Sequence, residues 1–419
     1  MADRMLTTAT WGAAVGPDDG QAPQAEELVY VLGGALHAAG LPAHRLEEML
    51  NRVAMRYGIQ VHVFSLPTGL LYSFVRQGPP VTALLRLAPS PTNLEKLRRL
   101  TAEAEALARS GGDPAAAIAR VGALAATPPR WGRGATVLGF ALSSAAFSVF
   151  FGGGRYELGV AAAVGTVVGL IAFLFGPRRG ASRRFELIAA AFAGLIAGAA
   201  DSYWVPLASG LIALLPGLAL VDAIEELANG HPTSGSARMA GVGVAFLTLI
   251  FGVLLGVALD DVLLGDGPEQ PMAAFPWWAT IPALGVAAAG SVIRFQARPR
   301  DWWLFLIASA VAFGGSKLGA LLGNPLLGPF VGALLLAGMA SLYAQLRGSA
   351  PQMVLVPGLV MLVPGSFGLR SMNTMLSGDA VVGIEEGFQM LMTTMAIVAG
   401  LLAGSSLRLP RFEHGRVAG

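Results

Sequence analysis

A short apolar stretch occurs twice in this chain, and the repeat constrains the fold more than any other feature. The copies are SGLIALLPGLALVDAIEEL at 209–227 and PGLVMLVPGSFGLRSMNTML at 357–376, and equivalent positions lie 148 residues apart. Each copy is long enough to cross a bilayer and carries a Pro-Gly pair near its middle. The repeat therefore predicts two related membrane segments in two halves of one chain.

The Pro-Gly pairs predict a break in both segments. Proline removes a hydrogen bond inside a helix and clashes with the preceding turn, and glycine tolerates the unwound backbone. In lipid, the freed backbone groups need another partner. Matched broken helices in two halves of a membrane protein indicate the substrate site of a secondary transporter. We therefore predict that Pro216, Gly217, Pro364 and Gly365 form part of a substrate site.

The composition supports a membrane protein. Hydrophobic residues make up 54% of the chain, charged residues only 13%, and the mean hydropathy is +0.62. A net charge of +2 is too small to indicate nucleic-acid binding. The absence of cysteine excludes disulfides, thiolate metal sites and cysteine nucleophiles, and no motif for a cofactor or metal is present.

The N-terminal part has the pattern of a small α+β domain. Residues 1–22 form a polar leader that we expect to be disordered, and 23–130 form the domain. Apolar spacing predicts helices at 26–39, 42–57, 93–108 and 114–125. Alternating β-branched residues at 59–64 and 70–75, joined by SLPTG, predict a hairpin, with a third strand at 81–87.

The rest of the chain is a succession of apolar segments of membrane-spanning length. They lie at about 135–152, 157–175, 185–201, 205–227, 237–259, 277–293, 302–322, 326–346, 352–376 and 381–404. We assign 131–262 to a first membrane half, 263–407 to a second half, and 408–419 to a tail. Since five spans per half is an odd number, the two halves have opposite orientation. The predicted fold is a polytopic α-helical membrane protein, a 5+5 inverted repeat of about ten transmembrane helices behind a small α+β cytoplasmic domain.

Arginines fall in alternate loops, which predicts the orientation in the membrane. The arginine-bearing sites are 130 and 133, 178–184, 238, 294–300, 347, and 408–416. The other loops are nearly free of basic residues, and the one at 260–271 is acidic. An excess of arginine marks the cytoplasmic side, so both termini are predicted to be cytoplasmic.

Three ionisable residues inside the predicted spans are candidates for transport. Asp222 and Arg370 occupy equivalent positions of the two copies and carry opposite charges, and Lys317 lies in the seventh segment. The alternative interpretation is an ion pair between Asp222 and Arg370, or basic side chains that reach the interface.

Several polar groups complete the predicted substrate site. Ser209, Ser366 and Asn373 could offer hydroxyl or amide groups to a substrate, although such side chains also join helices in membranes. The half-helices that begin at Gly217 and Gly365 would direct their N-terminal N–H groups toward one anionic group.

Two alternatives to a transporter have little support in the sequence. A channel would need a filter motif, and none is visible. A membrane hydrolase would need a catalytic dyad, but Ser316 and Lys317 are adjacent on one helix and point apart. His37, His44 and His62 in the N-terminal domain have no accompanying catalytic motif. We predict that the chain is not an enzyme.

The quoted stretches, taken together, resemble the threonine/serine exporter family. The likeness rests on GLPAHRLEEMLNRVAMRYG, VHVFSLPTGLLYSF, PTNLEKLRRL, FFGGGRYELG, ASGLIALLPGLALVDAIEELANG and VPGLVMLVPGS, in that order, and covers about residues 25 to 405. The sequence departs from the family pattern at Glu157, where the resemblance leads us to expect aspartate.

The resemblance implies an exporter of small hydroxy amino acids, threonine and serine, in a bacterial inner membrane. Because the sequence contains no nucleotide-binding loop, we expect export to be driven by an ion gradient, most simply the proton gradient. Export of small dicarboxylates such as succinate is the alternative that it leaves open. The expected partners are the amino acid, protons and the lipid bilayer, with no nucleic acid and with a homo-oligomer allowed.

The arginine pattern yields a test of orientation in this cysteine-free chain. With Asp266→Cys in the acidic loop, an impermeant maleimide should label intact cells from outside, because that loop is predicted to face away from the cytoplasm. Labelling of Asp266→Cys only after the cytoplasmic face has been exposed would reverse the predicted topology.

Overall fold

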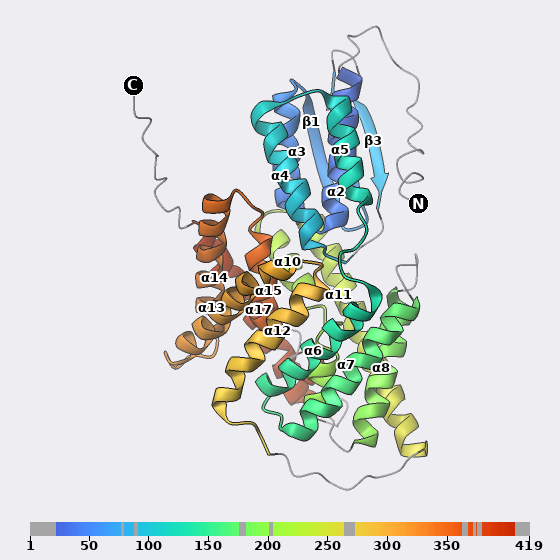
Figure 1. The fold of residues 1–419 in the computed structure, drawn as a ribbon, viewed down its shortest axis with the longest axis vertical. Helices are drawn as coiled ribbons and strands as arrows, with labels where there is room; N and C mark the ends of the chain where they lie inside the picture. The colour runs from blue at the N-terminus through green and yellow to red at the C-terminus, as the bar shows by residue number, and fades with distance from the viewer. Residues whose placement is uncertain are drawn as a thin grey trace.

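The computed structural model describes residues 22–76, 79–87, 91–175, 182–200, 204–263, 273–362, 368–371, 374 and 379–406. Two parts are visible in Figure 1. An N-terminal unit of helices and one sheet stands on a helical bundle that contains the rest of the described chain.

The N-terminal unit has the predicted α+β composition. Its elements are α2 (Ala22–Ala39), α3 (Ala43–Arg56), β1 (Gln60–Leu66), β2 (Gly69–Val75), β3 (Val81–Arg86), α4 (Leu94–Ser110) and α5 (Pro114–Ala126). The strands form an antiparallel sheet in the order β1-β2-β3. The predicted hairpin and third strand are therefore confirmed.

Amphipathic helices cover this sheet because their apolar residues recur on one face. Leu46, Leu50 and Val53 of α3 are fully buried, as are Tyr72 and Phe74 of β2. Side-chain caps fix where the next two helices begin. The side chains of Asn93 and Asp113 accept hydrogen bonds from backbone N–H groups in the first turns of α4 and α5, respectively.

The bundle contains one helix or broken helix for each apolar segment of the sequence. Its elements are α6 (Arg133–Phe150), α7 (Arg155–Phe175), α8 (Ser182–Ala199), α9 (Trp204–Gly210), α10 (Gly217–Ala228), α11 (Pro232–Leu263), η1 (Trp277–Ala279), α12 (Thr280–Arg294), η2 (Pro299–Asp301), α13 (Trp302–Ala320), α14 (Leu327–Arg347), α15 (Gln352–Leu362) and α17 (Ala380–Ser406).

Six of these helices are long and apolar enough to cross a membrane. They are α6, α7, α11, α13 together with η2, α14 and α17. The remaining segments, α8, α9 with α10, α12 and α15, do not meet both conditions within the described residues. The structure thus supports a mostly helical membrane protein, but it does not confirm ten spans in a 5+5 repeat.

Glycines allow two helix pairs of the bundle to approach closely. A side chain at Gly252 or Gly256 of α11 would collide with backbone atoms of α8. Likewise, a side chain at Gly400 or Gly404 of α17 would collide with backbone oxygens of α14. Small residues at such crossings are typical of helices packed in lipid.

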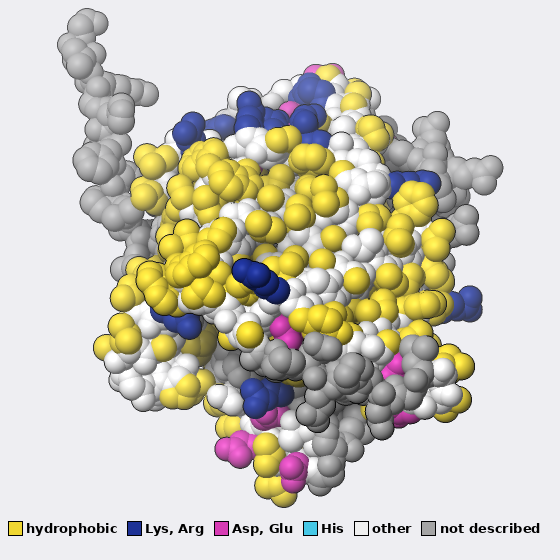
Figure 2. Space-filling view, turned by 60° about the horizontal axis from the view of Figure 1, so that its bottom comes forward, with side chains coloured by type: hydrophobic (Ala, Val, Ile, Leu, Met, Phe, Trp, Pro, Cys, Tyr) yellow, Lys and Arg dark blue, Asp and Glu magenta, His cyan; other side chains and the backbone are white. Residues whose placement is uncertain are grey.

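The exposed surface of the bundle is strongly apolar. Figure 2 shows a face on which hydrophobic side chains cover much of the visible surface and charged side chains are few. Phe251 on α11 is 62% exposed and Phe388 on α17 is 61% exposed. Large apolar patches of this kind indicate contact with a membrane or a partner rather than with water.

The N-terminal unit holds the turn that follows α12. The backbone N–H of Leu94 donates to Phe295 O (2.9 Å), and Arg298 Nη2 donates to Glu95 Oε1 (2.7 Å). Trp131, between the two parts, donates from its backbone N–H to Gln296 Oε1 and from its indole N–H to Ala297 O. These contacts fix the segment 295–298, which we call the clamped turn.

A second contact joins the unit to the turn between α10 and α11. His231 Nε2 lies 3.1 Å from Glu47 Oε2, and His44 Nε2 lies 3.6 Å from Glu225 Oε1. Burial lowers the pKa of His44 to about 4, assisted by the charges of Arg45 and His231. The unit therefore contacts the bundle at the ends of two helices, α10 and α12.

Glu95 provides a test of the clamped turn. Burial alone would raise its pKa, but hydrogen bonds from Arg298, Arg98 and Arg99 and the charge of Arg98 lower it from 4.5 to about 2. Because the folded pKa is depressed, the stabilisation is complete above about pH 4.5 and is lost as pH falls toward 2. Glu95→Gln should lower the free energy of unfolding by about 1–3 kcal/mol at neutral pH.

Thermal unfolding of the detergent-solubilised protein at several pH values measures this effect. The matched control is Glu103→Gln, which removes an ion pair with the half-exposed Arg120 and should cost less than about 1 kcal/mol. An equal difference between wild type and Glu95→Gln at pH 7 and pH 2.5 would contradict the assignment.

Candidate functional site

The first apolar copy is broken where its Pro-Gly pair lies. Helix α9 ends at Gly210 and α10 begins at Gly217, so residues 211–216 connect them without forming an α-helix. Pro216 is the residue before the first turn of α10, with φ of −79° and ψ of 37°. We call 211–216 the break.

Side chains from two other helices bind the carbonyl groups at the break. Ser144 Oγ on α6 donates to Gly210 O (3.3 Å), and Arg294 Nη2 on α12 donates to Ala213 O (3.2 Å). A carbonyl freed from helical hydrogen bonding in an apolar interior needs such a donor. The break is thus held by α6 and α12.

Arg294 is the site residue that sequence reasoning missed. It was counted among loop arginines, but it is the last residue of α12, and its guanidinium lies over the rings of Phe140 (5.7 Å) and Phe295 (5.4 Å). Its Nη1 atom is buried without a hydrogen-bond partner among the described residues. The side chain of an arginine at the end of an apolar segment can point into the bundle or out toward the aqueous surface. The sequence contains no signal that distinguishes these two orientations for Arg294.

The structure places the predicted polar residues of the first copy in different surroundings. Ser209 is fully buried, and its hydroxyl donates to Val205 O of its own helix. Asp222 on α10 is partly exposed, and no hydrogen bond or ion pair of its carboxylate is found within the described ranges. Of these two, only Asp222 keeps a polar group available for a ligand.

A buried ion pair lies one turn beyond Asp222. Glu226 is fully buried and binds Arg238 of α11 (2.8 Å) and the hydroxyl of Ser234 (2.8 Å). Because Glu226 is adjacent to Glu225, which faces His44, this pair lies next to the N-terminal unit. It joins α10 to α11 on the side of the bundle that the unit covers.

The structure pairs Arg370 with a residue of α17, rather than with Asp222. Arg370 Nε lies 2.7 Å from Glu386 Oε1, Thr374 Oγ1 donates to Glu386 Oε2 (2.9 Å), and the guanidinium lies 5.9 Å from the Trp204 ring. The Asp222–Arg370 ion pair considered from the sequence is not present in the described part of the chain. Glu386 lies within a predicted span, and the residue that faces it depends on helix packing, which the sequence alone does not indicate.

Glu386 has a counterpart in the first half. Arg238 lies 148 residues before Glu386, and Glu226 lies 148 residues before Thr374. Contacts at equivalent positions therefore join α10 to α11 and Thr374 to α17. The basic Arg238 is replaced by the acidic Glu386, and the acidic Glu226 by the uncharged Thr374.

Lys317 borders a cavity of about 250 Å³ between α6, α13 and α15. The other lining residues are Phe147, Phe150, Phe151, Phe313, Ser316, Ala320 and Met361. The Lys317 ammonium lies 5.4 Å from the Phe313 ring, and it has no ion pair with any described residue. A mainly aromatic cavity with one cation suits a small ligand that carries a carboxylate.

The break that the sequence predicts in the second copy lies outside the described residues. Pro364, Gly365, Ser366 and Asn373, all predicted for the substrate site, belong to this part. Helix α15 ends at Leu362, just before them, and contributes Met361 to the Lys317 cavity.

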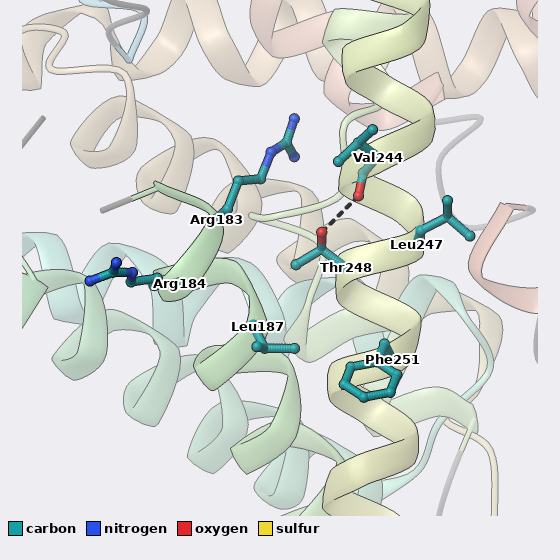
Figure 3. Close-up of a pocket in the computed structure, with 7 residues that line it drawn as sticks. All are labelled: Arg183, Arg184, Leu187, Val244, Leu247, Thr248 and Phe251. Atoms are coloured by element: carbon teal, nitrogen blue, oxygen red, sulfur yellow. Dashed lines mark hydrogen bonds between the residues drawn. The ribbon is translucent and has the colours of Figure 1, made fainter. Parts of the chain in front are cut away.

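A surface groove of about 420 Å³ lies elsewhere, between α8 and α11 (Figure 3). Its walls are mostly apolar, with Leu247 and Phe251 on α11, and Arg183 and Arg184 lie at one end. Arg183 is engaged with Glu186 and with Gly241 O. The groove faces outward from the bundle and does not reach the break.

Comparisons with known proteins agree with this architecture. The family model of the threonine/serine exporters matches residues 27–260 and 269–408. A threonine/serine exporter of Corynebacterium glutamicum is 25% identical over 95% of this chain and 86% of its own length. No solved structure matches the chain.

Fungal proteins are also similar. The pheromone-regulated membrane protein 10 of Eremothecium gossypii is 25% identical over 92% of this chain, and an uncharacterised protein of Schizosaccharomyces pombe is 23% identical over 65%. The chain spans 56% and 38% of these two relatives. Since the family model covers nearly the whole chain and describes membrane exporters, not enzymes, this membrane protein belongs to the threonine/serine exporter family.

Proposed function

We propose that the protein is a secondary transporter that exports small hydroxy amino acids, threonine and serine, and uses the proton gradient. The observation that carries this proposal is the break between α9 and α10, whose backbone is held by Ser144 and Arg294. Asp222, on the helix that follows the break, has a carboxylate without a hydrogen bond among the described residues. Unwound backbone inside a membrane bundle is tolerated where it lines a cavity or binds substrate.

An inverted repeat of five plus five helices is part of the proposal. Two pairs of glycines at the 148-residue offset support it: Gly252 and Gly256 pack α11 on α8, and their equivalents Gly400 and Gly404 pack α17 on α14. The contacts at equivalent positions, Glu226 with Arg238 and Thr374 with Glu386, support it as well. In this proposal residues 131–262 and 263–407 are the two halves, 23–130 the domain, and 1–22 and 408–419 the terminal segments.

The proposed orientation places the N-terminal unit and both termini in the cytoplasm of a bacterial cell. The arginine pattern supports it, and so does the position of Arg238 and Arg298 on the side that the unit covers. In this proposal, transport takes place across the bacterial inner membrane.

The residues around the break suit a zwitterion. The carboxylate of Asp222 can bind the substrate ammonium or take up the exchanged proton. The N–H groups at the start of α10, and the second break in the proposed repeat, supply positive potential for the substrate carboxylate. Pro216 and Pro364 keep these helices from closing, and Ser366 and Asn373 can offer a partner for the substrate hydroxyl.

The ion pairs Glu226–Arg238 and Arg370–Glu386 can close opposite ends of the proposed transport path. Glu226–Arg238 lies beside the N-terminal unit, and Arg370–Glu386 lies near Trp204, at the other end of α9 and α10. In an exporter with alternating access, one pair would separate while the other holds. This assigns Arg370 a closing role rather than contact with substrate.

A small dicarboxylate such as succinate is the second candidate substrate. The observation that favours it is a pair of cations, Arg294 and Lys317, neither of which has an acidic partner within the described residues. The two carboxylates of a dicarboxylate could bind one cation each. Phe140 of α6 lies against Arg294, and Phe147 and Phe150 of α6 line the cavity beside Lys317, so the proposed dicarboxylate path runs along α6.

Counterflow of labelled threonine, serine and succinate into proteoliposomes tests the proposed function. Wild type should exchange threonine and serine without a gradient and accumulate them when a pH gradient is imposed. Asp222→Asn should keep exchange but lose at least about tenfold of the proton-driven accumulation, because the amide cannot carry the proton.

Asp261→Asn, an exposed carboxylate on α11, is the matched control and should behave as wild type. Full proton-driven accumulation of threonine by Asp222→Asn would exclude the proposed coupling. Exchange of succinate alone would replace the amino-acid substrate by the dicarboxylate.

A further inference from the structure

We infer that Arg294 binds the carboxylate of the transported substrate at the break, on the side of the bundle that the N-terminal unit covers. The inference rests on the proposed transport function and adds a binding residue that lies outside both apolar copies. It concerns the carboxylate, which threonine, serine and succinate share.

The guanidinium of Arg294 has more donors than the protein uses. One hydrogen bond from it is found, from Nη2 to Ala213 O, and Nη1 is buried without a partner in the described part of the chain. Its other neighbours are the phenyl rings of Phe140 and Phe295. Phenyl rings stabilise a cation but accept no strong hydrogen bond.

A purely structural role does not account for a charge at this position. Ala213 O needs only one hydrogen-bond donor. A neutral hydroxyl is sufficient for the carbonyl of Gly210, three residues earlier, which Ser144 binds. A buried cation without an anionic partner is costly, and a guanidinium matches a carboxylate with two parallel hydrogen bonds. The free donors of Arg294 therefore fit a substrate carboxylate.

The surroundings of Arg294 explain why the substrate would bind there. Ala213, which it contacts, lies four residues before Gly217, where the amides of α10 begin. Asp222 follows five residues later on α10, about 7.5 Å along the axis. A cation and a carboxylate thus flank the start of α10, as an amino acid with one charge of each sign requires.

The N-terminal unit holds the backbone that carries Arg294. The clamped turn begins at the next residue, and Leu94, Trp131 and Glu95 bind it. Gln296 within it has a φ of 56°, in the left-handed region, so several contacts stabilise an uncommon conformation. A binding group fixed in this way loses little freedom when substrate binds.

Substrate binding by purified Arg294→Gln tests the inference directly. Glutamine can still donate to Ala213 O but carries no charge. Titration calorimetry in detergent should show a threonine affinity about 10- to 100-fold weaker than that of wild type, since a charge-assisted hydrogen bond is lost. Threonine amide, which lacks the carboxylate, should bind equally weakly to both proteins.

Two further variants separate charge from structure. Arg294→Lys keeps the charge without the planar fork and should fall between wild type and Arg294→Gln in its preference for threonine over the amide. Arg300→Gln, an exposed arginine six residues away, is the matched control and should leave both affinities unchanged. If Arg294→Gln does not fold, the preference of Arg294→Lys decides the question.

Two results would overturn the inference, and they are distinguishable. A folded Arg294→Gln that binds threonine within twofold of wild type would remove Arg294 from the site while transport stands. If wild type binds none of threonine, serine and succinate, the proposed function itself fails, and the inference fails with it.

Discussion

The structure depends on one constraint: backbone groups freed at the break inside an apolar bundle must be bound by something other than water. The break leaves carbonyls that the helix cannot satisfy, and Ser144 and Arg294 bind two of them from helices α6 and α12. Ser144 and Arg294, which stabilise the unwound backbone, are therefore also polar side chains in contact with the break. This links the stability of the broken helix to the chemistry of the proposed substrate site.

The N-terminal unit controls both helix ends beside the break. Through Leu94 and Glu95 it holds the clamped turn after Arg294, and through His44 and Glu47 it holds the turn after α10. A shift of the N-terminal unit would therefore move the ends of α10 and α12 together. In an exporter, such a connection lets the occupancy of the site and the position of the unit influence one another.

The elements that could be predicted from sequence are those governed by local chemistry. Alternation predicted the β1–β2 hairpin, and the Pro-Gly pair predicted the interruption before Gly217, because each depends on neighbouring residues. The partners of charged residues depend on which helices pack together. For this reason Glu386 and Arg294 were missed, although equivalence of Glu386 with Arg238 could have been read from the 148-residue offset.

Substrate protection of a cysteine at the break measures the central claim most directly, namely that substrate binds there. In the cysteine-free chain, threonine should slow maleimide alkylation of Ala213→Cys, because bound substrate covers that position. Alkylation of Val244→Cys, in the groove between α8 and α11, should be unaffected. Equal alkylation of a transport-active Ala213→Cys with and without saturating threonine would contradict the account.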